Sequence, residues 1–197
     1  FKAATGSAAC SACPTNSGTD SATGTAASTG CKSTVCDTEG KCLNQQVTCP
    51  DGADCTVTCS AESSCKGAVI TCPATGECTV ICSHENSCQE ATIQGPSVCG
   101  DLTLDCTGEM SCYKSPITLP RNGNSVIRCT GSSGCQEAQF LGSSTTTTGG
   151  SSSTTTTGFK GDLSLTCESQ ELYAQSACEQ AQLYAPRGAT TVTASGA

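Results

Sequence analysis

The sequence predicts an all-β fold, a disulfide-stapled parallel β-helix (β-solenoid) built from coils of about 23 residues with two Ser/Thr/Gly-rich loop insertions. Three observations support this: cysteine units recur at a fixed interval, each unit carries two short β-prone segments, and one unit has too little apolar mass to bury its own face. We expect one domain over 1–197, with a loop at 14–30 in the first coil, regular coils at 36–141, a Ser/Thr-rich loop at 142–161 and the last coils at 162–197.

The repeat is read from cysteines that each open a C-x5-C unit. Successive openings are 23, 23, 24 and 23 residues apart, at Cys36, Cys59, Cys82, Cys106 and Cys129. A longer copy runs from Cys167 to Cys178. An interval of this length is typical of solenoids, in which neighbouring units stack to share a narrow core.

Each unit contains two strand-like segments. An apolar residue lies five positions after every closing cysteine, at Val47, Ile70, Ile93, Ile117, Phe140 and Leu183. The second segment precedes the next opening cysteine, and because alternate strand residues share a face, Val57 should point inward with Cys59. A 3.6-residue stripe is lacking, so helix fits poorly, except that the insertion at 169–177 could form a helical turn or two.

Two Ser/Thr/Gly-rich runs interrupt the same turn of the repeat, four coils apart, at 14–30 and 142–160. With coils stacked about 4.8 Å apart, both loops should leave one edge of the solenoid roughly 20 Å from each other. Runs of this composition are usually flexible linkers, but in a secreted chain they are also O-glycan acceptors. The candidate acceptors are Thr145, Thr146, Thr147, Thr148, Thr154, Thr155, Thr156 and Thr157.

Composition indicates an extracellular protein. The chain has 20 cysteines and no tryptophan in 197 residues, which is typical of a cross-linked scaffold in an oxidising compartment. It begins at Phe1 without a leader, so we expect a mature secreted product, free or displayed as a cell-surface fibre. A net charge of −8 argues against binding of nucleic acid. The lack of a long apolar run argues against membrane insertion. With one CxxC and one histidine, the sequence predicts neither a metal nor a cofactor.

The spacing of the cysteines favours disulfides within coils. Cys55 and Cys59 would lie about 13 Å apart on one strand, too far to pair, whereas a C-x5-C unit that turns a corner can close. A competing scheme pairs stacked coils, such as Cys59 with Cys82, and stays open. The predicted bridges are Cys13–Cys31, Cys36–Cys42, Cys49–Cys55, Cys59–Cys65, Cys72–Cys78, Cys82–Cys88, Cys106–Cys112, Cys129–Cys135 and Cys167–Cys178.

This scheme leaves Cys10 and Cys99 without partners. Cys10 is held within three residues of Cys13, which gives it a reach of roughly 10 Å, whereas three coils span about 14 Å. A bond between them within one chain would be stretched. A disulfide between Cys10 and Cys99 of neighbouring subunits is the alternative hypothesis.

The predicted role is structural. No convincing cap is seen at the last coil, and an open solenoid end permits head-to-tail stacking into an O-glycosylated extracellular filament, with self-association as the main partnership. The alternative is a carbohydrate- or ice-binding module, suggested by outward threonines whose array is interrupted by Gln94, Thr103 and Arg128. The threonines are Thr56, Thr58, Thr71, Thr79 and Thr92.

We do not expect an enzyme. The acidic candidates for polysaccharide cleavage are Asp101, Asp105 and Asp162, but Asp101 and Asp162 share one Gly-Asp-Leu position, which indicates local hydrogen bonding. His84 lies beside Glu85 within a C-x5-C turn, where a solvated residue is expected rather than a general base.

Repeats such as Cys-Thr-Val-Thr-Cys-Ser-Ala-Glu-Ser-Ser-Cys at 55–65 resemble those of the Cys-rich, Ser/Thr-rich repeat proteins that microbial eukaryotes secrete. The resemblance covers about residues 13–194 and rests on composition and repeat rather than on a specific motif. It implies an extracellular or surface structural role.

Overall fold

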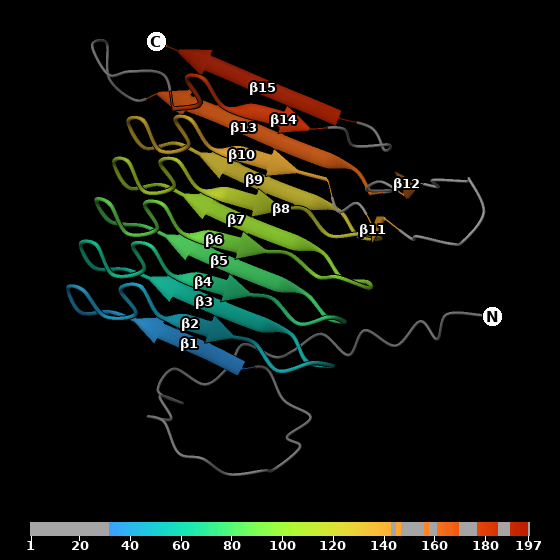
Figure 1. Ribbon diagram of the computed structural model, residues 1–197. Coiled ribbons are helices and arrows are strands. Elements are labelled where there is room, and N and C mark those ends of the chain that lie inside the picture. The colour runs from blue at the N-terminus through green and yellow to red at the C-terminus, as the bar shows by residue number, and fades with distance from the viewer. Residues whose placement is uncertain are drawn as a thin grey trace.

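The protein is a parallel β-solenoid of about six turns, shown by a computed structural model in Figure 1. The structure describes residues 32–142, 145–146, 156–157, 161–169, 177–184 and 190–196. No helix occurs within these ranges, and so none there is long and apolar enough to cross a membrane. The predicted fold class is therefore confirmed.

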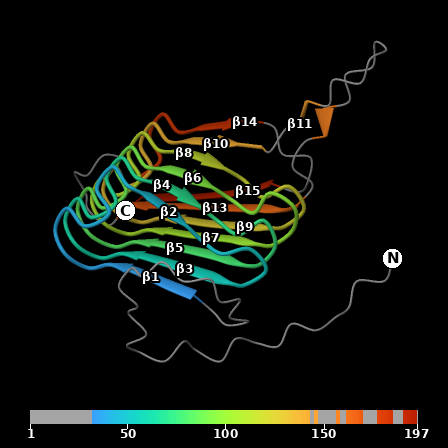
Figure 2. The same cartoon turned by 60° about the horizontal axis from the view of Figure 1, so that its bottom comes forward.

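Each coil contributes one longer strand to a first sheet and one shorter strand to a second, and the two sheets face each other across the core (Figure 2). Sheet 1 contains, in order, β1 (Lys32–Cys36), β3 (Cys55–Cys59), β5 (Cys78–Cys82), β7 (Leu102–Cys106), β9 (Ser125–Cys129), β13 (Leu163–Ser169) and β15 (Thr190–Gly196). Sheet 2 contains β2 (Gln46–Thr48), β4 (Val69–Thr71), β6 (Thr92–Gln94), β8 (Pro116–Thr118), β10 (Gln139–Leu141) and β14 (Gln182–Tyr184).

The strands of both sheets pair in register, so equivalent residues form columns along the solenoid axis. Cys59 on β3 pairs with Cys36 on β1 and with Cys82 on β5. Ile70 on β4 pairs with Val47 and Ile93 in the same way. The 23-residue interval therefore sets the register, because a slip by one residue would turn the apolar set outward.

The core consists of inward columns of small aliphatic side chains and cystines. On sheet 1, β3, β5, β7 and β9 alternate buried residues with partly or fully exposed ones, as the pattern around Val57 predicted. Val57, Val80, Leu104 and Ile127 form one fully buried column, and Ile70, Ile93, Ile117 and Phe140 form the facing one.

The eight within-coil cysteine pairs predicted for the described part of the chain have their sulfur atoms within bonding distance. Six of them, Cys36–Cys42, Cys59–Cys65, Cys82–Cys88, Cys106–Cys112, Cys129–Cys135 and Cys167–Cys178, staple the turn that leads from sheet 1 to sheet 2. Cys49–Cys55 and Cys72–Cys78 staple the opposite turn. Cys59 is thus bonded to Cys65 and not to the Cys82 that lies beside it.

Leucine side chains occupy column positions of the opposite turn after its two cystines end. In the next coil Leu102 takes the column position of Cys78, and one coil further Leu119 takes that of Cys72; both side chains are fully buried. Leucine side chains therefore fill the volume that the sulfur atoms occupy in the earlier coils.

Several predicted features fall partly or wholly outside the described residues. Cys10, the Cys13–Cys31 bridge and the loop at 14–30 lie outside them. So does most of the insertion at 169–177, in which the sequence allows a helical turn or two; β13 extends through Ser169 at the start of this insertion. Within the second loop, β11 (Thr145–Thr146) and β12 (Thr156–Thr157) pair as a short antiparallel ladder.

Candidate functional site at the solenoid end and on its faces

The C-terminal end of the solenoid exposes its core. Val192 on β15 continues the inward column of sheet 1, yet its side chain is 55% exposed, against 5% for its neighbour Leu165 on β13. Leu183 on β14 continues the inward column of sheet 2 and is 38% exposed, against 0% for Phe140 on β10. Leu183 differs in burial from the other five apolar residues of its column, because no further coil lies above it among the described residues.

The backbone at this end also offers an unpaired sheet edge. Among the described strands, β15 pairs with β13 alone, and it is the last strand of its sheet. It spans Thr190–Gly196, as many residues as β13 and more than the other strands of the sheet. Such an edge is a template for another strand.

The cystine turns, meaning each C-x5-C unit with the two residues that follow it, give the solenoid an axial polarity. The fifth, seventh and ninth residues of each turn donate their N–H groups to carbonyl oxygens of the next coil toward the C-terminus, whereas the residue after the opening cysteine donates back to the preceding coil, as Ser60 does to Cys36 at 3.2 Å. The turn at 59–67 is representative: Ser63 donates to Glu85 at 3.1 Å, Cys65 to Ser87 at 2.6 Å and Gly67 to Gln89 at 2.8 Å. The next turn repeats this from Asn86, Cys88 and Glu90.

The two ends of the turn stack are therefore complementary. At the C-terminal end, Cys178 and Gln180 are equivalent to the donors Cys65 and Gly67 of an inner turn, and no acceptor faces their N–H groups within the described residues. At the N-terminal end, Lys41 and Leu43 are equivalent to the acceptors Ser87 and Gln89 of an inner turn, and their carbonyl oxygens meet no donor among the described residues. Lys41 and Leu43 are both exposed, so this part of the first described coil is accessible.

Left-handed backbone conformations recur within these turns. Ser63, Asn86, Met110 and Ser133 form one column with φ between 49° and 55°, and Glu90 and Lys114 belong to a second. Non-glycine residues in this region cost roughly 1 to 2 kcal/mol each. The inter-coil hydrogen bonds and the cystines offset that cost, so the turn shape depends on stacking.

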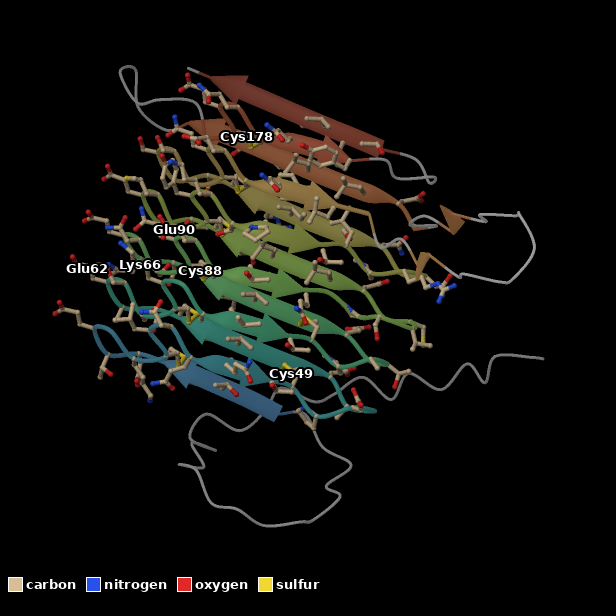
Figure 3. All side chains as sticks on the ribbon, viewed as in Figure 1. Cys49, Glu62, Lys66, Cys88, Glu90 and Cys178 are labelled. Carbon is tan, nitrogen blue, oxygen red and sulfur yellow. A yellow bond between two sulfur atoms is a disulfide. The ribbon has the colours of Figure 1, made fainter. Side chains whose placement is uncertain are left out.

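Charged side chains lie along the solvent edge of the cystine turns, where Figure 3 labels Glu62, Lys66 and Glu90 on the solvent side of Cys88. The Lys41 ammonium hydrogen-bonds the carboxylate of Asp37 at 3.2 Å and lowers its pKa. The pKa of Lys114 is raised by a hydrogen bond with Tyr113 and by the charge of Glu137. The Oε2 atom of Glu137 lies 3.6 Å from Nζ of Lys114. These pairs are solvated and are worth little individually.

The outward face of sheet 1 carries two rows of side chains. The sequence pattern alone did not predict which residues lie in each row. The first, which we call the hydroxyl row, bears a hydroxyl at every position except Val126; it consists of Ser33, Thr56, Thr79, Thr103, Val126, Ser164 and Thr191. The second row is mixed and consists of Val35, Thr58, Ile81, Asp105, Arg128, Thr166 and Thr193.

The single threonine surface suggested by the sequence was wrong in one respect. Thr56, Thr58 and Thr79 lie on sheet 1, but Thr71 and Thr92 lie on β4 and β6 of sheet 2. The two sets therefore face away from each other. On sheet 2 the Thr71 hydroxyl donates to Gln94 at 3.3 Å, which occupies it within the sheet.

Asp101 and Asp105 lie in one coil, directly before β7 and on it, whereas Asp162 lies two coils further on; the acidic candidates for catalysis also have structural partners. Asp101 accepts a hydrogen bond from the backbone N–H of Asn124 in the next coil at 2.8 Å, so its bonding joins coils rather than being local. Asp105 lies 3.6 Å from the Arg128 guanidinium on the adjacent strand. The N–H of Asp162 donates to the side chain of Asn124 at 3.1 Å. His84 is exposed in its turn beside Glu85, as expected.

Sulfur atoms of successive cystines come within 4.8 Å of one another along the solenoid, for example those of Cys36, Cys59 and Cys65. A metal would require thiolates, and all three sulfurs belong to disulfides. Cys99 is a free, exposed thiol in the turn between β6 and β7, while its proposed partner Cys10 lies outside the described residues.

Comparison with known protein families, curated proteins and solved structures finds no match to this chain. The surfaces are therefore interpreted from their own geometry.

Proposed function

We propose that this protein is a secreted structural subunit that stacks head-to-tail, end coil on end coil, into an extracellular filament. The observation that carries the proposal is the exposed core at the C-terminal end, where Val192 and Leu183 occupy column positions that are buried in the preceding coil. A second copy placed above β14 and β15 would cover both side chains. Full burial of an aliphatic side chain is worth about 1.5 to 3 kcal/mol, so covering these two half-exposed ones supplies a few kcal/mol at most.

The axial polarity of the cystine turns supports the head-to-tail arrangement. Donors at Cys178 and Gln180 can meet acceptors at Lys41 and Leu43 of the next copy, as the same positions meet between coils. A two-fold contact between two C-terminal ends would bring the N–H groups of Cys178 and Gln180 to a surface that lacks the carbonyl oxygens of Lys41 and Leu43. A contact that repeats the same rise and direction does not close, and it generates a fibre.

An extracellular location is supported by the cystine-rich scaffold. Eight disulfides are dense for the described part of the chain, and such bridges persist in oxidising compartments. Stabilisation of small apolar cores by cystines is typical of secreted domains.

O-glycans on the second loop complete the proposal. The backbones of Thr145–Thr146 and Thr156–Thr157 pair beside the stack between β10 and β13, while Thr147, Thr148, Thr154 and Thr155 lie outside the described residues. Sugars there would extend from the side of a filament and leave its ends free. Intact mass spectrometry of the protein from its natural source tests this, and a mass equal to that of the bare polypeptide argues against it.

A disulfide between Cys99 and Cys10 of a neighbouring subunit remains part of the proposal. Cys99 is exposed and lies in a middle coil, so such a bond would tie subunits through the N-terminal segment rather than through the stacked ends. Non-reducing electrophoresis tests it: a ladder of oligomers that collapses on reduction supports the bond, and a single monomer band contradicts it.

The filament itself is tested with Val192→Asp, which places a carboxylate in the end contact, and with Val126→Asp as the matched control. Val126 is also exposed, but it lies on the outward face of β9, away from the ends. We expect the wild type and Val126→Asp to form filaments in negative-stain images, and Val192→Asp to stay monomeric. Monodisperse wild-type particles at high concentration would remove the proposal.

Mixing the two forms tests polarity. In a head-to-tail filament, a Val192→Asp subunit can still bind through its N-terminal end to the growing C-terminal end, and it then stops growth there. A small fraction of the variant should therefore shorten the filaments. If the N-terminal end took no part in the contact, the variant would be left out and the length would change only by dilution.

A further inference from the structure

The hydroxyl row on sheet 1 is both regular and uncharged. Its members stack in register across β1 to β15 without a bulge, so their spacing is that of the strands, about 4.7 to 4.9 Å. Alternate residues along a strand add a second repeat of about 6.6 Å toward the second row. The face is thus a two-dimensional array rather than a pocket.

The array is rigid. Thr56, Thr79 and Thr103 are β-branched, and such side chains have few accessible χ1 rotamers. All three are half-buried between their strand neighbours, which restricts them further. The hydroxyl and methyl groups of the row are therefore held at repeated positions before any ligand arrives, which lowers the entropy cost of binding.

Charge and side-chain chemistry limit the ligand. The chain carries a net charge of −8, yet the hydroxyl row has no charged member, and the second row has only the Asp105–Arg128 pair, which is neutral as a whole. Charged partners thus gain nothing on this face. The row also contains no aromatic ring, carboxamide or carboxylate, which are the usual means of orienting a single small molecule such as a sugar.

We propose that the outward face of sheet 1 binds ice through the hydroxyl row. Ice presents water molecules at fixed repeated positions, so it complements a rigid, repeated array of hydroxyl and methyl groups. The hydroxyls hydrogen-bond lattice waters, and the methyl groups limit the other positions that water can take between them. This inference is independent of the filament, because it uses a side of the stack and not its ends.

The test uses the full chain, measured for shaping of single ice crystals and for thermal hysteresis. Thr79→Lys places a charge in the middle of the hydroxyl row on β5. Thr118→Lys is the matched control, because Thr118 is equally half-buried but lies on β8 of sheet 2. Far-UV circular dichroism and titration of free thiols show whether each variant keeps its fold and its disulfides.

We expect the wild type and Thr118→Lys to shape ice, and Thr79→Lys to lose this activity while it stays folded. Monomeric Val192→Asp should keep the activity, which separates this inference from the filament. The inference is overturned if the wild type leaves ice growth unchanged, or if Thr118→Lys loses as much activity as Thr79→Lys. Retention of the wild type on cellulose or chitin without any effect on ice would assign the face to a polysaccharide and also overturn it.

Discussion

Replacement of Gly123 by alanine should destabilise the solenoid because the coils approach each other there without room for a side chain. An added Cβ at Gly123 would lie 1.8 Å from the carbonyl oxygen of Gly100 in the preceding coil, where real Cβ atoms stay beyond 3.0 Å. The coils would have to separate by about 1.2 Å (3.0 − 1.8). The obstacle is backbone, so no side chain can rotate away.

The magnitude follows from what such a separation disturbs. Gly123 is flanked by the hydrogen bonds from Asn124 N–H to Asp101 at 2.8 Å and from Leu102 N–H to Asn124 at 2.9 Å. Overpacking alone costs about 1 to 3 kcal/mol, and each weakened bond adds up to about 1 kcal/mol. We expect the free energy of unfolding to fall by about 2 to 4 kcal/mol.

Guanidinium chloride unfolding with the disulfides intact measures this effect, with Gly52→Ala as the control. An added Cβ at Gly52 meets nothing within 4 Å, but its φ of 78° remains unfavourable for alanine, at a cost of about 1 to 2 kcal/mol. Gly123→Ala should therefore unfold at the lower denaturant concentration. Equal midpoints for the two variants would refute the steric reasoning.

The other stability predictions concern the staples and the core. Removing the Cys59–Cys65 bridge by a double alanine substitution should cost about 2 kcal/mol in the same unfolding assay, because the bridge closes only a short loop; an unchanged midpoint would contradict this. Asp101→Ala should lower stability by about 1 kcal/mol and Asp101→Asn should restore most of it, since an amide oxygen can still accept the Asn124 N–H; equal losses would argue against this role. Phe140→Ala should cost about 3 to 5 kcal/mol, and a loss below 1 kcal/mol would mean that its side chain is not packed as described.

Much of the fold could be predicted because one short pattern fixes several levels of structure together. The C-x5-C units set the coil length and the turn staples, and the apolar residue five positions after each closing cysteine identifies sheet 2. The pairing of Cys59 with Cys65 rather than with the adjacent Cys82 follows from the same local geometry.

The candidate surfaces were harder to predict because they depend on how coils align across insertions. Ser164 joins the hydroxyl row only when the loop at 142–161 is left out of the count, and Thr191 joins it only after the insertion before Cys178 is removed. The sequence also places Thr71 near Thr79 along the chain, although the two residues lie on opposite sheets. Axial polarity is a property of backbone hydrogen bonds, and no side-chain pattern reports it.

The central claim is that the stack of coils continues from one subunit into the next. Fibre diffraction from aligned, concentrated protein tests this claim most directly. The claim predicts a strong reflection near 4.8 Å along the fibre axis, because every strand would lie perpendicular to that axis. A reflection of that spacing oriented across the axis, or no fibre at all, would contradict it.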